Sequence, residues 1–203
     1  MKYIFTLLFA LANVFMASAQ WSNTSNLFYD SLHSPVCYTT DEQVHAIIVQ
    51  SFPDSGYFVI WEDARNTATN KRDIYAQKYD KAGNMLWALN GLPVVNSSND
   101  QHFTWSSNQD YRNRKTAATD SAGGFYIAYI DDSIATYDWS RICVQHIRPD
   151  GSQVFPGAGF IIAQTPSGQP YNYSQPQLIG DDAGGFYVSY IKNSDNDYVY
   201  VYG

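Results

Sequence analysis

The chain contains an internal tandem repeat. Residues 73–101 recur as residues 141–169 at a constant offset of 68 residues. A period of tens of residues is typical of proteins in which each copy is one supersecondary unit that buries its apolar face against a neighbour. The repeat therefore constrains the architecture more than any single motif does. The aligned pairs include Gln77 with Gln145, Gly83 with Gly151, and Trp87 with Phe155.

The most apolar part of the repeat occurs three times, at residues 56–61, 124–129 and 185–190. Apolar residues occupy both alternating sets of positions in the first copy, which predicts a strand buried on both faces. Each unit offers about four runs of a length typical for strands. In the first unit these are residues 35–40, 44–50, 57–62 and 73–79. We predict an all-β fold of tandem four-stranded antiparallel blades, a partial and open β-propeller.

Shared anchors place the boundaries of the units. Residues 35–37 followed by Gln43 match residues 93–95 followed by Gln101. Propellers close with roughly 4 to 8 blades, so we expect the sequence to be an amino-terminal fragment of a longer protein with further blades or domains. The predicted divisions are an N-terminal segment at residues 20–34, a first blade at 35–92, a second blade at 93–160 and an incomplete third blade at 161–203.

Turn chemistry agrees with this division. Residues 80–84 and 148–152 each separate two apolar runs and supply a glycine after an aspartate. Residues 120–124 and 181–185 follow the same pattern. Aspartate commonly closes a turn by accepting hydrogen bonds from its own backbone, and these segments lack the ligand density of a calcium loop. We interpret them as hairpin turns without metal.

The amino terminus resembles a secretory signal peptide. Lys2 precedes an apolar run over residues 4–16, and residues 17–19 form a small-residue cleavage site. The run is shorter than the roughly 20 residues that a spanning helix needs, so we expect no membrane insertion after cleavage of residues 1–19. A formal net charge of −7 disfavours nucleic acid as a partner. We predict a secreted or cell-surface protein.

Only two cysteines are present, Cys37 and Cys143. They align with Val95 and Tyr75, which are apolar or aromatic positions, so we interpret them as buried thiols, with a single disulfide as the alternative. Neither has a second ligand at metal-binding spacing, and we expect no metal and no cofactor.

Four motifs of the first unit resemble a known family. They are Trp-Glu-Asp-Ala-Arg at residues 61–65, Asp-Ile-Tyr-Ala-Gln at 73–77, Gly-Asn-Met-Leu-Trp at 83–87 and Asn-Gly-Leu-Pro-Val at 90–94. The chain resembles the secreted repeat proteins common in Bacteroidetes. The resemblance implies a β-propeller-like ectodomain, often in a protein that ends in a sorting domain for type IX secretion. The second unit departs from the first two motifs at residues 129–133 and 141–145.

The acid pair Glu62 and Asp63 lies beside Arg65 at a predicted strand end, and such a group can bind a polar ligand or perform acid–base chemistry. A catalytic pair is not expected to be a repeat signature, and an aspartate and an arginine near a strand end commonly tie a loop to its neighbour. We therefore predict no catalytic residue. We interpret the repeat signature as structural: Trp61, Asp63, Arg65, Gln77, Gly83, Trp87, Gln145, Gly151 and Phe155.

Three function classes remain open. A sialidase-like, glycan-processing propeller is disfavoured because its motif places the aromatic three residues after glycine, whereas Trp87 and Phe155 lie four after Gly83 and Gly151. A spacer for a catalytic domain outside this sequence is the second class. We favour a non-enzymatic protein for surface binding, adhesion or display, with a glycan or protein ligand at aromatic loops. The candidate binding residues, with Phe103 beside them, are Trp105, Tyr137, Trp139, Tyr171 and Tyr173; packing of these rings on the blade is the alternative.

Overall fold

The computed structural model describes residues 35–66, 68, 71–95, 97–103, 115–132, 140–166, 168–169, 172–193 and 198–203. Every regular element in this part of the chain is a β-strand, which confirms the predicted all-β class. The predicted signal peptide and the segment at residues 20–34 lie outside the described residues. A search of the described residues finds no helix with the length and hydropathy that crossing a membrane requires.

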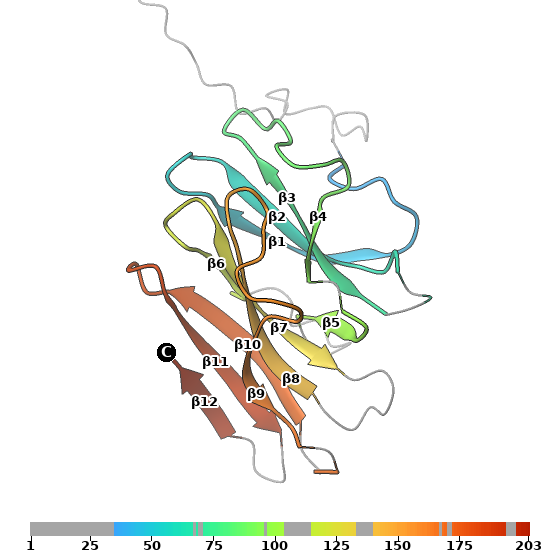
Figure 1. Cartoon of the computed structure of the whole chain (residues 1–203), viewed down its shortest axis with the longest axis vertical. Coiled ribbons are helices and arrows are strands. Elements are labelled where there is room, and N and C mark those ends of the chain that lie inside the picture. Colours follow the sequence, from blue (N-terminus) through green and yellow to red (C-terminus); the bar gives the residue numbers. More distant parts are fainter. Residues whose placement is uncertain are drawn as a thin grey trace, which may run out of the picture. The chain divides into compact units, whose positions relative to one another are not determined.

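Sheet A is a four-stranded antiparallel sheet whose strands follow one another in sequence order (Figure 1). Its hairpin between the third and fourth strands turns at Asp80, whose Oδ1 accepts hydrogen bonds from the N–H groups of Ala82 and Asn84. Gly83 has a φ of 82°, a conformation that favours glycine. The strands are β1 (Gln43–Gln50), β2 (Tyr57–Asp63), β3 (Asp73–Tyr79) and β4 (Leu92–Val95).

Sheet B repeats this order, but its first strand is broken into two pieces that both pair with β7. Its strands are β5 (Asp100–His102), β6 (Ala117–Thr119), β7 (Phe125–Asp132), β8 (Ser140–Ile147) and β9 (Phe160–Gln164). Sheet C has three antiparallel strands, β10 (Asn172–Gly180), β11 (Phe186–Asn193) and β12 (Tyr198–Tyr202). The three sheets are therefore built on one plan.

The sheet boundaries differ from the predicted repeat boundaries. β4 pairs with β3 and belongs to sheet A, although residues 93–95 open the predicted second unit. β9 likewise pairs with β8 rather than joining sheet C. A repeat defines a period but not its phase, and the connections at residues 80–91 and 148–159 return these strands to the sheet that precedes them. The strand predicted at residues 35–40 is wrong, because this segment has no regular structure.

The first strand of each sheet is interrupted at the same place. In β1 the pairing with β2 shifts between Val44 and Ile47, and His45 there has a φ of 56°. In β10 the shift lies between Ser174 and Gln177. In sheet B the gap between β5 and β6 falls at this ladder position. A β-bulge leaves its extra residue unpaired and bends the strand, so this interruption is a shared feature of the three first strands.

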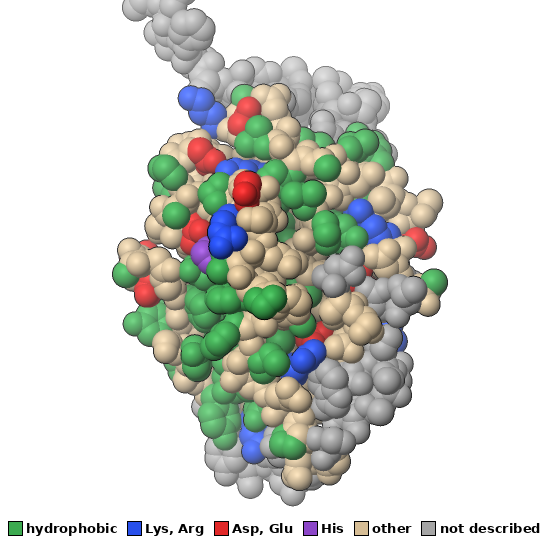
Figure 2. Space-filling view, in the orientation of Figure 1, with side chains coloured by type: hydrophobic (Ala, Val, Ile, Leu, Met, Phe, Trp, Pro, Cys, Tyr) green, Lys and Arg blue, Asp and Glu red, His purple; other side chains and the backbone are tan. Residues whose placement is uncertain are grey.

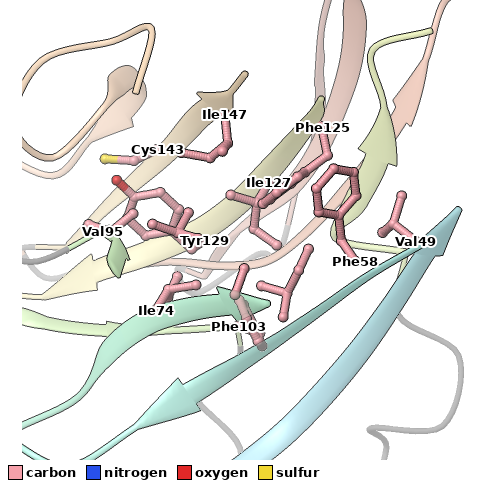
Figure 3. Close-up of a cluster of buried hydrophobic side chains, with 13 residues drawn as sticks. Val49, Phe58, Ile74, Val95, Phe103, Phe125, Ile127, Tyr129, Cys143 and Ile147 are labelled. Atoms are coloured by element: carbon pink, nitrogen blue, oxygen red, sulfur yellow. The ribbon is translucent and has the colours of Figure 1, made fainter. Parts of the chain in front are cut away.

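Each sheet packs face to face on the next. Phe58 and Ile60 of β2 meet Phe125 and Ile127 of β7 in one buried cluster, with the rings of Phe58 and Phe125 4.7 Å apart (Figure 3). The opposite face of β7 packs on sheet C, where the rings of Tyr126 and Phe186 lie 5.0 Å apart. The alternation of side chains along β7 thus serves two interfaces, as expected for a strand buried on both faces.

Candidate functional site

Acidic residues gather where β2 and β7 end. Glu62 and Asp63 close β2, and Asp131 and Asp132 close β7. All four are buried. Because burying an unpaired carboxylate is costly, each must be held by positive or hydrogen-bonding partners. These partners determine whether the four carboxylates can take part in catalysis or ligand binding.

Asp63 is fixed by Arg65 and Trp61. The Arg65 Nε donates to Asp63 Oδ1 at 2.8 Å and its Nη2 to Oδ2 at 2.6 Å, while the Trp61 indole donates to Oδ2 at 2.8 Å. The guanidinium also lies 3.8 Å from the centre of the Tyr75 ring and donates to the Asn90 carbonyl at 3.0 Å. Burial by itself raises the pKa of Asp63, but the hydrogen bonds from Arg65 and Trp61 bring that pKa below its ordinary value.

Asp131 occupies the equivalent place in sheet B. Position 133 is a serine and not an arginine, and Arg141 pairs with Asp131 instead. Arg141 stands directly opposite Asp131 across β7 and β8. Gln101 Nε2 donates to Asp131 Oδ1 at 2.9 Å, and Asn99 Nδ2 donates to Oδ2 at 3.2 Å. The second unit thus keeps the ion pair although it lacks the motif.

Glu62 ties sheet A to the chain that leaves β5. Its Oε1 accepts the N–H of Phe103 at 2.7 Å. Its Oε2 lies 3.0 Å from His45 Nδ1, in the bulge of β1, and 3.3 Å from Arg72 Nη1. Arg72 Nη2 continues to Glu42 Oε2 at 2.7 Å. Glu62 is therefore a junction between strands and is not presented to solvent.

Two further histidines pair with carboxylates in sheet B. His102 Nε2 lies 2.6 Å from Asp132 Oδ2, and both side chains are 8% exposed. Burial raises the pKa of Asp132, although His102 acts in the opposite direction. His146 Nε2 lies 2.8 Å from Asp120 Oδ2, and its ring stacks on Tyr126. A histidine–carboxylate pair supports catalysis where a substrate can reach it, which the burial of His102 and Asp132 opposes.

A cavity of about 380 Å³ lies on the face of sheet A that points away from sheet B. Its walls are residues 35–37, residues 43–46, and the side chains of Val59 and Trp61. The lining is mainly apolar, with the Cys37 thiol at one side. The Cys37 Sγ lies 3.3 Å from Arg65 Nη2. The cavity is therefore an apolar pocket that lies beside the ion pair of Asp63 and Arg65.

Both cysteines are free thiols, so the disulfide alternative is wrong. Cys143 is buried in the cluster between sheets A and B, and burial raises its pKa to about 12, which keeps the thiol protonated. Cys37 is partly exposed at the cavity. Across the described ranges, no set of three histidine, cysteine or acidic side chains is placed to hold a metal ion.

Most of the predicted binding aromatics, namely Trp105, Tyr137, Trp139 and Tyr171, lie outside the described residues. Tyr173 is described, and its ring makes an edge contact with Tyr190 at 5.5 Å between centroids. Phe103 is buried in the cluster between sheets A and B. These two rings pack on the sheets, which was the alternative to ligand stacking.

The two repeated glutamines accept the same pair of N–H groups in both units and differ by one position in the carbonyl to which they donate. Gln77 Oε1 accepts the N–H groups of Lys78 and Trp87, and Gln145 Oε1 accepts those of His146 and Phe155. Each glutamine amide also donates to a backbone carbonyl of the hairpin, Ala88 or Phe155. Trp87 and Phe155 pack against the two inter-sheet clusters, and Gly151 has a φ of 88° in its turn.

Sequence reasoning missed the Arg141 pair, the Glu62 junction and the His102–Asp132 pair. A signal for the first was present, because aligning the β7–β8 hairpin places positions 131 and 141 opposite each other. The other two depend on how the chain leaves β5, which no local pattern reveals. No protein-family model, curated protein or solved structure matches this chain.

Proposed function

We propose that this chain is a non-enzymatic, exported repeat protein that serves binding, adhesion or display at the cell surface. Its stacked sheets act as successive blades of a propeller-like body. The observation that supports this proposal most is the pairing at the strand ends. Asp63 and Asp131 hold equivalent places, and each is neutralised by an arginine from a different position in its unit.

A catalytic role for these carboxylates is disfavoured by their surroundings. A general base operates best with a pKa near the working pH and within reach of a substrate. Hydrogen bonds from Arg65 and Trp61 hold the pKa of Asp63 below its ordinary value, against the effect of burial. Glu62 and Asp131 are fully buried and engaged with neighbouring residues. These contacts stabilise strand ends and leave little freedom for proton transfer.

The connections between strands are the natural place for a ligand. β2, β7 and β11 are equivalent second strands, so the loops that follow them leave the sheets at one common end. Tyr137 and Trp139 belong to the connection between β7 and β8, and Tyr171 precedes β10, whose first residue pairs with the end of β11. Loops on a rigid scaffold commonly carry binding residues, and aromatic rings stack well on sugars.

Binding is tested with the exported chain on an array of cell-surface polysaccharides. The proposal expects retention that falls at least tenfold in Trp105→Ala and Trp139→Ala and is unchanged in Tyr38→Ala, a control at an exposed ring. Retention that both tryptophan variants leave intact would contradict loop binding. Absence of retention would contradict the binding role and favour display alone.

Enzymatic activity is tested separately with glycoside substrates. The proposal expects no turnover above a heat-denatured control. Turnover that disappears in Asp63→Asn, when this variant keeps the melting temperature of the parent, would contradict the non-enzymatic assignment. It would favour the sialidase-like alternative instead.

A further inference from the structure

Sheet A places a lysine between an aspartate and an aromatic ring. Lys78 on β3 stands directly opposite Phe58 on β2. Its Nζ lies 2.8 Å from Asp54 Oδ2 and 5.3 Å from the centre of the Phe58 ring, within reach of a cation–π contact. A lysine side chain ordinarily stays charged at neutral and mildly acid pH. The positive charge at this place in sheet A is therefore present across that range.

Sheet B has a histidine at the same place. His146 on β8 stands opposite Tyr126 on β7, as Lys78 stands opposite Phe58. Its Nε2 lies 2.8 Å from Asp120 Oδ2, and its ring stacks on the Tyr126 ring with 4.1 Å between the centroids. Sheet B thus keeps the carboxylate and the aromatic ring but replaces the lysine by a side chain that is charged only when it is protonated.

The two aspartates are held in the same way. Both lie in the turn between the first and second strands of their sheet. Asp54 Oδ1 accepts the N–H of Gly56 at 3.1 Å, and Asp120 Oδ1 accepts that of Gly124 at 2.8 Å, so each Oδ2 faces the basic side chain. Burial raises the pKa of Asp120, but hydrogen bonds from His146 and from the backbone bring that pKa below its ordinary value. Asp120 is thus ionised in the pH range in which a histidine titrates.

Both arrangements reach the next sheet through an equivalent acceptor. Lys78 Nζ donates to the carbonyl of Gly123 at 3.4 Å, and the hydroxyl of Tyr126 donates to the carbonyl of Gly184 at 2.6 Å. Gly123 and Gly184 hold the same place in the turns before β7 and β11, where their φ angles are 95° and 94°. His146 therefore stacks on the ring whose hydroxyl joins sheet B to sheet C.

Two carboxylates lie close to the stacked rings of His146 and Tyr126. Burial raises the pKa of Tyr126, and the charges of Asp120 and Asp181 raise it further. Asp181 belongs to the turn before β11, so it brings negative charge from sheet C. Arg148, two residues after His146, donates its guanidinium within its own hairpin. A proton on the imidazole thus adds a positive charge where negative charge is concentrated.

The imidazole of His146 is accessible to protons from solvent. Its side chain is 18% exposed, and that of Asp120 is 5% exposed. Figure 2 shows histidine surface next to acidic and basic side chains on the face drawn there. On β8's other side, the ring of Phe155 lies 6.4 Å away and is apolar. The pair can therefore exchange a proton with the medium without unfolding of the sheet.

We infer that a proton bound at His146 strengthens the contact between sheets B and C, so that this contact responds to the pH of the medium. The protonated imidazole supplies here the charge that Lys78 supplies at the preceding interface. It strengthens the hydrogen bond to Asp120, because a bond between charged groups is stronger than one between neutral groups. It also adds a cation–π contact to the Tyr126 ring. This inference concerns the stacking of the sheets and does not depend on the ligand binding proposed above.

The inference is tested by amide hydrogen exchange on the full exported chain at about pH 8 and about pH 5.5, on either side of the ordinary histidine pKa. The reporter is the amide of Leu178 on β10, which donates to the carbonyl of Lys115 across sheets B and C. Its protection factor, corrected for the intrinsic effect of pH, measures local opening. In the parent it should rise at least about threefold at the lower pH. His146→Gln should lose this rise, and His146→Lys should show high protection at both values.

Two further variants control the experiment. His45→Gln removes another partly exposed histidine that lies against a carboxylate, in sheet A, and should keep the rise. Asp120→Asn keeps the Oδ1 that accepts the N–H groups of Ala122 and Gly124 but loses the negative charge. It should abolish the rise while leaving the turn intact. The test therefore does not depend on the folding of a single variant.

The outcomes separate the site from the rest of the molecule. A Leu178 protection factor that stays the same at both pH values in the parent overturns the inference. A rise that persists in His146→Gln or in Asp120→Asn overturns it as well, because the proton responsible then binds elsewhere. A rise that disappears in both of these variants and remains in His45→Gln supports it.

Discussion

Asp131 and Arg141 face each other across β7 and β8 and form in sheet B the ion pair that Asp63 and Arg65 form in sheet A within one loop. The aspartate occupies the same position in both sheets. The arginine comes from the following loop in sheet A and from the neighbouring strand in sheet B. A carboxylate buried at a strand end must be neutralised, but the source of the guanidinium is free to vary. The two units thus share a buried aspartate whose negative charge is neutralised by an arginine.

Arg141→Ala should destabilise the protein by about 3 kcal/mol, because it leaves the buried carboxylate of Asp131 without its cation. Urea unfolding of the exported chain measures the change in the free energy of unfolding. Arg148→Ala removes an exposed arginine from the same hairpin and serves as the control, with an expected change near zero. Equal effects of the two variants would contradict a structural role for the Arg141 pair.

The two buried glutamines should matter equally. Gln77→Ala and Gln145→Ala each leave hairpin N–H and C=O groups without their partner, and each should cost about 1–3 kcal/mol of stability. Chemical denaturation of the single variants and of the exposed control Gln50→Ala measures this. A loss at one glutamine only would show that the two hairpins are not equivalent, contrary to the shared contacts.

Phe58→Ala should cost about 3–5 kcal/mol, because it empties the interface between sheets A and B. The side chain is fully buried and packs on Phe125 and Trp87. Tyr38→Ala, at an exposed ring, provides the comparison in the same unfolding experiment. If both substitutions had similarly small effects, the sheets would not be packed through this cluster.

Stability should fall in acid through Asp54. A hydrogen bond from Lys78, at 2.8 Å, and one from Ser51 lower the pKa of this carboxyl to about 2. Because the folded pKa lies below the unfolded value of 3.8, the contribution is complete above that value and disappears as the pH falls through about 2. The stability difference between parent and Asp54→Asn, measured from pH 5 to pH 2, should therefore shrink with falling pH. A difference that stays constant would contradict the Lys78 contact.

The alternation within residues 57–63 and 125–132 made the doubly buried strands predictable, because both faces of each strand are apolar. The glycine turns were predictable for the same local reason. The boundary between one sheet and the next could not be predicted, because the pairing of β4 with β3 depends on the fold and not on a local pattern. Phe103 was misplaced among loop aromatics because only the break between β5 and β6 directs it inward, next to Glu62.

The strand-end pairs show the same limit of local reasoning. Asp63 and Arg65 are two residues apart, so their contact was readable from the motif. Asp131 and Arg141 come together through strand register, and His102 and Asp132 through the pairing of β5 with β7. Contacts made by register require a known sheet, which the sequence pattern alone does not define.

Equivalent sheets stack through equivalent faces, and nuclear Overhauser contacts between aromatic rings are the measurement that examines this stacking. The rings of Phe58 and Phe125 lie 4.7 Å apart across sheets A and B, and those of Tyr126 and Phe186 lie 5.0 Å apart across sheets B and C. Tyr57 and Tyr79, 4.9 Å apart within sheet A, give the internal reference. We expect cross-peaks for all three pairs. Observing only the Tyr57–Tyr79 contact would show formed sheets that do not stack, which would contradict packing of the sheets through these faces.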